Sequence, residues 1–440
     1  MYTALSDKVE KFLMPVATKL STQRHLRAIR DSFIALLPIT LMGGVVSVIN
    51  SAPVTKTTTN PILLTWAGFA SNNSAILSWI SALTLGAMSL YICIGMTYFL
   101  CKHYKIEPFI PTLIAILGFV MLITNPIKLG FDAKSIDISY IDGKGLIPAI
   151  LLAIINVELY NFMRSREWGK IKLPDSVPQS LSEVFASLVP AFLLIVLYSL
   201  IFTVFNKLGT FLPKYLYGIL SPTFKAADSL PFAIFITFLV QFFWFFGIHD
   251  AALAGILGPI RDGNLSVNAA AQMAGKPLPF VFTTSFWVYF VIIGGCGSVL
   301  ALAVLLVRSK SVQLKTVGRI GLIPSLFGIS EPITFGVPLM LNPIFFIPFT
   351  FTSTINAGIS FILMHGGVIK KTYAMLSWNM PNFFGAFLST MDWKAFILVV
   401  GLFVLDVIIY YPFFKIYEKQ MLKLESENEQ SAEIENSTSV

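Results

Sequence analysis

The chain has 440 residues, of which 55% are hydrophobic and only 12% are charged. A soluble domain carries about twice that share of charged residues, and so few cannot cover a water-exposed surface. The composition therefore excludes soluble enzymes and predicts an all-α membrane protein that crosses the bilayer many times. The net charge is +8, but Lys and Arg lie in short loops between apolar segments, which favours membrane topology over nucleic-acid binding.

Nine segments are predicted to span the membrane, since a span needs about 20 mostly apolar residues. They lie near residues 32–50, 76–100, 109–124, 146–163, 185–205, 230–248, 283–307, 343–364 and 393–414. An odd number of spans would place two basic segments, 308–319 and 415–423, outside the cell. Cytoplasmic loops are normally the ones rich in Lys and Arg. We therefore predict a tenth span, with both chain termini in the cytoplasm.

The tenth span is expected within residues 251–282, which are rich in Ala and Gly but interrupted by Arg261, Asp262 and Pro277. Irregular, polar backbone occurs at membrane depth only where it is buried in protein or lines a cavity. Residues 208–226 are the alternative, although their pattern is more typical of an amphipathic helix at the membrane surface.

Glu331 is the strongest candidate for a functional residue. It lies between Pro324 and Pro348, in a stretch whose prolines and glycines prevent one continuous helix. Pro332 follows it and suits the first position of a helix, so Glu331 is expected where a short helix begins. A carboxylate at membrane depth is costly and usually faces a functional cavity. The alternative is a carboxylate that only stabilises the helix end.

A second candidate group surrounds His249. It follows an aromatic run and Gly247, where a helix is expected to break, and Asp250 comes next. This histidine is either a substrate-binding residue or a core residue, and the sequence supports both equally. Trp244 and Trp378 are able to stack on a sugar ring, although a single tryptophan more often packs or anchors a helix at the interface.

Other residue types indicate structure rather than chemistry. Glu158 and Asp406 are acids within apolar segments, and we predict structural pairing for both. Cys93, Cys101 and Cys296 show neither disulfide nor metal-ligand spacing. No phosphate-binding loop is present, so intrinsic ATPase activity is excluded. We expect neither a metal nor a cofactor.

Two motifs carry a resemblance to a known family. At GISEPITFGVPLMLNP (residues 328–343) and FFGIHDAALAG (residues 245–255), the sequence resembles enzyme IIC, the membrane component of the bacterial sugar phosphotransferase system. More narrowly, it resembles the lactose, cellobiose and chitobiose branch, over about residues 1–420. The resemblance implies a homodimer in the bacterial cytoplasmic membrane, with about ten spans and two re-entrant hairpins in each subunit.

On this basis the chain is expected to have four parts. They are an N-terminal dimer-interface domain at 1–205, an amphipathic connector at 206–229, a sugar-transport domain at 230–417 and a cytoplasmic tail at 418–440. The tail is polar and acidic, so it is expected to be disordered.

The resemblance also implies the chemistry. A separate enzyme IIB would pass a phosphoryl group from its phosphocysteine to the 6-hydroxyl of a bound disaccharide. Glu331 and His249 would act as the catalytic pair that holds the sugar near this hydroxyl, and Trp244 and Trp378 would stack on its rings. Lys144, in the segment DGKGL, is a further candidate for the substrate site. The alternative function is an ion-coupled secondary sugar transporter, which would also use broken helices and a midplane acid.

Overall fold

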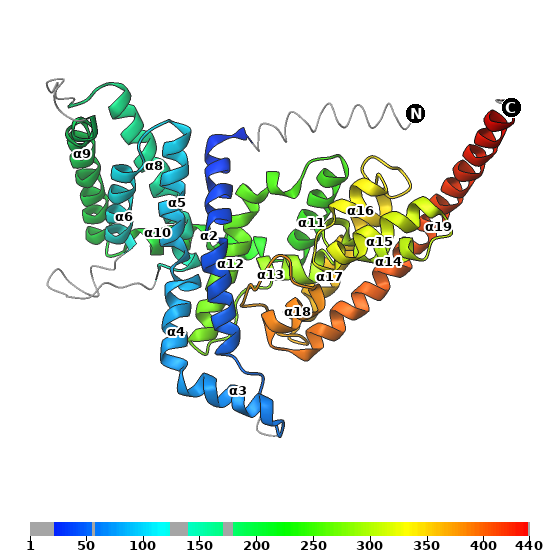
Figure 1. Ribbon diagram of the computed structural model, residues 1–440. Coiled ribbons are helices and arrows are strands. Elements are labelled where there is room, and N and C mark those ends of the chain that lie inside the picture. Colours follow the sequence, from blue (N-terminus) through cyan, green and yellow to red (C-terminus); the bar gives the residue numbers. More distant parts are fainter. Residues whose placement is uncertain (1–21, 55–57, 124–139, 170–178, 439–440) are drawn as a thin grey trace.

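The computed structural model describes residues 22–54, 58–123, 140–169 and 179–438. All regular secondary structure within these ranges is helical. The helices form two groups that follow the order of the chain, α2 to α10 and α11 to α19 (Figure 1). The all-α architecture predicted from the composition is thus confirmed.

The first group surrounds one apolar core. Side chains of α2, α5, α6 and α8 such as Met96 and Val157 are completely buried in it. Two short 3-10 turns, η1 (Leu85–Ala87) and η2 (Gly143–Gly145), connect its longer helices. The longer helices are α2 (Arg24–Ile49), α3 (Pro61–Asn72), α4 (Ser74–Leu83), α5 (Met88–His103), α6 (Phe109–Ile123), α8 (Leu146–Ser165), α9 (Gln179–Lys207) and α10 (Leu212–Ala227).

The second group is interrupted more often, because glycine and proline break its helices. Between η4 and α14, Gly294, Gly295 and Gly297 adopt positive φ angles that glycine tolerates best. The elements of this group are α11 (Leu230–Phe245), η3 (Asp250–Ala252), α12 (Ala254–Met273), α13 (Thr284–Phe286), η4 (Trp287–Val291), η5 (Cys296–Ser298), α14 (Leu300–Val307), α15 (Val312–Leu326), α16 (Glu331–Gly336), α17 (Phe346–His365), α18 (Asn382–Thr390) and α19 (Trp393–Thr438). The break predicted between Pro324 and Pro348 is confirmed, since α16 stands alone between α15 and α17.

Helix α12 joins the two groups. On one side it touches η2 so closely that a Cβ atom on Gly143 would lie 2.1 Å from the carbonyl oxygen of Gly263. On the other side, Asn268 Nδ2 donates a hydrogen bond to the carbonyl oxygen of Thr372 at 2.7 Å. This helix fills most of the segment in which the tenth span is expected.

Six helices of the described residues are long and apolar enough to cross a membrane, or seven if a bent pair around residue 299 forms one span. The six are Arg24–Ile49, Ser74–His103, Gly143–Ser165, Val184–Lys207, Phe346–His365 and Trp393–Glu427. Helices α6 and α11 are apolar but shorter. Helix α12 has 20 residues, the length of a span, with a less apolar composition. The count of ten spans therefore stays a prediction.

The last helix is the longest, with 46 residues and Pro412 inside it. It continues through residues 418–438, where the sequence predicts a disordered tail. The first part of this segment is anchored, because Glu418 accepts hydrogen bonds from Ser309 Oγ at 2.7 Å and from the amide of Lys310 at 2.8 Å. A polar composition alone does not reveal these distant partners.

Candidate functional site

The broken helices of the second group enclose a cavity of about 270 Å³. It lies where α11, η5, α16 and α18 meet, so each wall is a point at which a helix begins or ends. Among the side chains that line it are Trp244, His249, Asp250, Ser330, Glu331, Trp378 and Asn382. Four of the five predicted substrate-site residues are thus brought together from three separate segments.

His249 stands between two carboxylates in this cavity. Helix α11 ends at Phe245, and Gly247 turns the chain with φ of +85°, which confirms the predicted break. The imidazole Nδ1 lies 3.0 Å from Asp250 Oδ1, and Nε2 lies 3.9 Å from Glu331 Oε1. The side chain of His249 is 56% exposed and that of Glu331 is 45% exposed, so both remain accessible to a ligand.

Glu331 is the first residue of α16, as Pro332 predicts. Gly328, with φ of +77°, turns the chain just before it. Among the described residues, His249 is the basic side chain that comes within ion-pair distance of Glu331. Its carboxylate is therefore free of a Lys or Arg partner within those residues and is able to accept hydrogen bonds from hydroxyl groups.

The two tryptophans differ in their surroundings. Trp244 is only 2% exposed, and its ring centroid lies 3.9 Å from that of His249 at an interplanar angle of 67°. Its faces are covered, so this ring packs against the imidazole rather than offering a surface for a sugar. Trp378 is half-buried and lines the same cavity. Of the two rings, Trp378 is therefore the more accessible from the cavity.

Lys144 lies elsewhere. It belongs to η2 in the first group of helices, and its Nζ is 3.1 Å from Asp142 Oδ2. Burial raises the pKa of the Asp142 carboxyl, and the Lys144 ammonium and amide oppose this shift. The structure thus shows a local structural partner for Lys144 and does not bring it to the cavity of Glu331.

Asn382 is a cavity residue that the sequence did not identify. Its Nδ2 donates to the carbonyl oxygen of Val288 at 2.7 Å, and its Oδ1 accepts from the amide of Gly294 at 2.9 Å. It therefore fixes the glycine turn beside the cavity. The sequence marks only the broken segment in which Asn382 lies, because no local pattern reports a contact 88 residues away.

The two acids predicted to pair have different partners. Glu158 accepts hydrogen bonds from His25 Nε2 at 2.8 Å and from the Tyr104 hydroxyl at 2.7 Å, so its structural pairing is confirmed. Asp406 is fully buried, and its Oδ2 accepts from Asn356 Nδ2 at 3.1 Å. Its partner among the described residues is an amide and not a cation.

The cavity has the groups that a sugar requires. Hydroxyl groups need acceptors such as the Glu331 and Asp250 carboxylates, and the apolar face of a pyranose ring suits an aromatic plane such as Trp378. Within the described ranges, no group of three or more His, Cys, Asp or Glu side chains is arranged to hold a metal ion. A polar cavity at the junction of broken helices in an apolar, all-helical chain defines a membrane transport protein.

Comparisons with known proteins identify the family to which the chain belongs. The family model described as "Phosphotransferase system, EIIC" matches residues 30–353, and the chain belongs to this family. It is 30% identical to the putative permease IIC component YwbA of Bacillus subtilis, over 95% of this chain and 96% of that protein. It is 32% identical to the lactose-specific EIICB component of Staphylococcus haemolyticus, over 94% of this chain and 71% of that protein.

A solved structure agrees with these relatives. The transporter ChbC, the IIC component of the N,N'-diacetylchitobiose-specific phosphotransferase system, superposes with a TM-score of 0.86 and 28% identity. The superposition covers 95% of this chain and 99% of that one. The predicted resemblance is confirmed, and the chain is a multi-pass permease component of a sugar phosphotransferase system in the cell membrane. These relatives give no support to the ion-coupled alternative.

Proposed function

We propose that the chain binds a disaccharide in the cavity of Glu331, His249 and Trp378 and carries it across the membrane as enzyme IIB phosphorylates its 6-hydroxyl. The observation that carries this proposal is the meeting of Glu331 and His249, 3.9 Å apart, beside an accessible tryptophan. The names of the relatives mention lactose, lichenan, oligo-beta-mannoside and diacetylchitobiose, which supports a disaccharide or short oligosaccharide as substrate.

In this reaction the phosphoryl group leaves the phosphocysteine sulfur of IIB and forms a bond to the sugar oxygen. The P–S bond breaks and leaves the IIB cysteine as a thiolate, and the proton of the sugar hydroxyl passes to Glu331 or, where Glu331 only orients the oxygen, to this thiolate. Glu331 accepts the hydrogen bond of that hydroxyl, which either orients the oxygen or removes its proton. His249, held by Asp250 on one nitrogen, directs its other nitrogen toward the same point.

The proposal includes a division of the chain. Residues 1–205 would form the dimer-interface domain, 206–229 the connector and 230–417 the transport domain. The separate apolar cores of the two helix groups support this division. A homodimer is supported by the exposure of α9. Of the 18 consecutive residues that form its most apolar stretch, only 17% are buried within one subunit.

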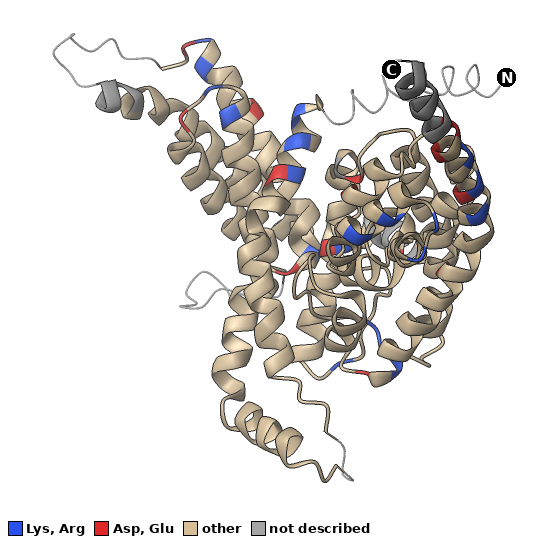
Figure 2. Ribbon diagram, turned by 45° about the vertical axis from the view of Figure 1, so that its right-hand side comes forward, with Lys and Arg blue, Asp and Glu red and all other residues tan. Residues whose placement is uncertain are grey.

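The proposal also includes ten spans with both termini inside the cell. The ends of α2, α12 and α17 meet around one cavity lined by Ser51, Lys276 and Gly367, which supports a common outer face. Lys and Arg gather largely toward the end of the molecule at which the C-terminus lies (Figure 2), as expected of a cytoplasmic face.

Vesicles that contain the purified chain test the proposed function. With radiolabelled disaccharide outside and phosphorylated IIB inside, we expect labelled sugar phosphate in the lumen. No sugar phosphate is expected from ATP or phosphoenolpyruvate without IIB. Uptake of free sugar that follows an imposed ion gradient would contradict the proposal.

A further inference from the structure

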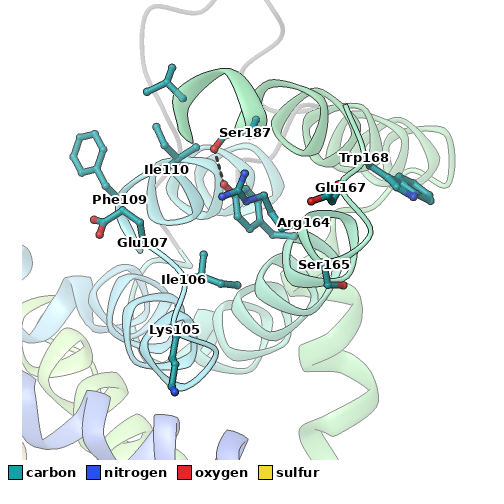
Figure 3. A pocket seen from close by; sticks show the side chains of 13 residues that line it. Lys105, Ile106, Glu107, Phe109, Ile110, Arg164, Ser165, Glu167, Trp168 and Ser187 are labelled. Atoms are coloured by element: carbon teal, nitrogen blue, oxygen red, sulfur yellow. Dashed lines mark hydrogen bonds between the residues drawn. The ribbon is translucent and has the colours of Figure 1, made fainter. Parts of the chain in front are cut away.

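Among the described residues, the buried side-chain polar atoms without a hydrogen-bond partner all lie in the second group of helices. In the first group, by contrast, the Tyr160 hydroxyl and Ser187 Oγ form a buried hydrogen bond of 2.7 Å, drawn as a dashed line in Figure 3. In the second group, Asp406 Oδ1 and Asn356 Oδ1 are both buried, and neither has a donor within the described ranges. Two side chains that touch each other therefore each keep an acceptor that buried sites normally satisfy.

Asp406 and Asn356 meet between two helices. Asn356 lies on α17 and Asp406 on α19, both are 0% exposed, and Asn356 Nδ2 donates to Asp406 Oδ2 at 3.1 Å. The same nitrogen lies 3.3 Å from Ser298 Oγ and 3.5 Å from the carbonyl oxygen of Val291. All three neighbours are able to accept, so this end of the Asn356 amide is the nitrogen, and the other end is an oxygen that needs a donor.

No cation neutralises Asp406. The helices packed against α19 are α14, α15, α17 and α18, and none of their described Lys, Arg or His side chains lies within ion-pair distance of Asp406. Tyr410, one turn further along α19, donates instead to the carbonyl oxygen of Gly297 at 2.6 Å. An isolated carboxylate in apolar surroundings costs so much free energy that the group takes up a proton instead.

We propose that Asp406 is a neutral acid, which holds a proton on Oδ1 and donates it in a hydrogen bond to Asn356 Oδ1. A protonated carboxyl group has one O–H donor and still accepts at its other oxygen. The acid then gives one hydrogen bond to the amide and receives one from it. A single proton thus removes the buried charge and satisfies both remaining oxygens.

This pair supports a glycine-rich turn in the wall of the Glu331 cavity. Ser298 ends the turn, and its Oγ lies 3.3 Å from Asn356 Nδ2. Ser298 Oγ also donates to the carbonyl oxygen of Val291 at 3.1 Å, so it connects the two ends of the segment. Asp406 therefore acts on the turn through one amide side chain.

The same turn packs against the residues beside Glu331. Gly295 and Cys296 line the Glu331 cavity. A Cβ atom on Gly295 would lie only 2.7 Å from the Cβ atom of Ser330, so the two turns are in direct contact. On the proposed function of this cavity, Asp406 is a positioning residue that affects sugar binding through the turn and does not touch the sugar.

Infrared difference spectroscopy of the full-length protein tests the proton. The spectrum of the unmodified protein minus that of Asp406→Asn should contain the carbonyl band of a protonated carboxyl group. Asp392→Asn is the matched control, because the Asp392 side chain accepts from the amides of Lys370 and Lys394, as an ionised carboxylate does. Its difference spectrum should contain carboxylate bands. Carboxylate bands in the Asp406→Asn difference spectrum would overturn the proposal.

Two substitutions test the positioning role. Asp406→Asn keeps one donor and one acceptor, so amide exchange of residues 292–298 should be unchanged and affinity for lactose or N,N'-diacetylchitobiose should stay within about threefold. Asp406→Leu removes both hydrogen bonds, so exchange should accelerate and affinity should fall about tenfold. Weakened binding in Asp406→Asn, or unchanged exchange in Asp406→Leu, would contradict the proposal. Failure of the unmodified protein to bind either sugar would instead count against the proposed function of the cavity, because the infrared and exchange results do not depend on a sugar.

A bound metal cation is the other means of neutralising Asp406. Thermal unfolding midpoints measured in the chlorides of sodium, potassium and choline separate the two cases. Equal midpoints are expected for the unmodified protein. A midpoint that sodium or potassium raises in the unmodified protein but not in Asp406→Asn would replace the proton by a metal ion and overturn the proposal.

Discussion

Two glutamates of this chain have different surroundings, although both are partly exposed side chains within an apolar sequence. Glu331 faces an open cavity next to His249, and Glu158 is held by His25 and Tyr104. Replacement by glutamine should therefore have a different consequence at each position. It should weaken sugar binding at Glu331 and lower the stability of the fold at Glu158.

Glu331→Gln should weaken sugar binding by roughly 2 kcal/mol, or about thirtyfold, with little change in the thermal unfolding midpoint. The amide removes the charge and places a donor where a sugar hydroxyl donates. Isothermal titration calorimetry with candidate disaccharides, together with thermal unfolding, measures both quantities. Normal affinity and a normal rate of phosphorylation would limit Glu331 to a role at the helix end.

Glu158→Gln is the matched comparison. It weakens the hydrogen bonds from His25 and Tyr104, so the unfolding midpoint should fall while sugar affinity remains normal. A change in sugar affinity without a change in stability would show that Glu158 communicates with the cavity.

At the scale of single residues, sequence reasoning worked where the backbone itself carries the signal. Gly247 and Pro332 fixed the breaks that expose His249 and Glu331. It did not identify Asn382, because the partners of that side chain lie 88 and 94 residues away in the chain. Lys144 pairs with the nearby Asp142 and does not line the Glu331 cavity.

At the scale of elements, the carboxylates of α19 hold the loop between α14 and α15. Glu418 is 4% exposed and accepts from Ser309 and Lys310, and Lys415 Nζ lies 2.7 Å from its other oxygen. Two helical turns further along α19, Glu425 accepts hydrogen bonds from Ser311 Oγ and from the amide of Gln313 in the first turn of α15. Helix α15 leads directly to the turn at Gly328 before Glu331. The hydrogen bonds of Glu418 and Glu425 therefore anchor the first end of α15, and its last end positions the Glu331 cavity.

Glu418→Gln should weaken the contact between α19 and the α14–α15 loop by roughly 2 kcal/mol. The new side-chain amide presents an N–H donor to Ser309 Oγ and to the Lys310 amide, which are themselves donors. Amide exchange of residues 309–313 should accelerate, and the thermal unfolding midpoint should fall. Lys419→Gln, an exposed neighbour on α19, is the control and should change neither. Unchanged exchange in Glu418→Gln would mean that the loop is held by other contacts.

Element boundaries were predictable where apolar length or a proline sets them, as in α2, α9 and α16. The helical continuation of α19 beyond residue 418 was not, because the segment is polar and Glu418 forms its hydrogen bonds with a loop more than 100 residues earlier.

At the scale of the whole molecule, the ten-span arrangement makes a prediction about access. In a chain whose native cysteines are replaced, Lys276→Cys should react with an impermeant maleimide on intact cells. Lys310→Cys should react only after permeabilisation. Both positions are exposed to solvent in one subunit, so burial does not explain a difference. Labelling of Lys310→Cys in intact cells would contradict the topology.

The length of α19 has a mechanical consequence. Its 46 residues extend for about 69 Å, more than twice the roughly 30 Å of a bilayer core. Its first residues adjoin α18, whose Asn382 supports the wall of the Glu331 cavity, and Glu418, near the middle of α19, accepts a hydrogen bond from Ser309. A tilt of α19 by about 10° around Glu418 would therefore displace the end beside α18 by about 6.5 Å. Pro412, just before this anchor, has no amide hydrogen to donate within the helix, so a bend of α19 is expected there.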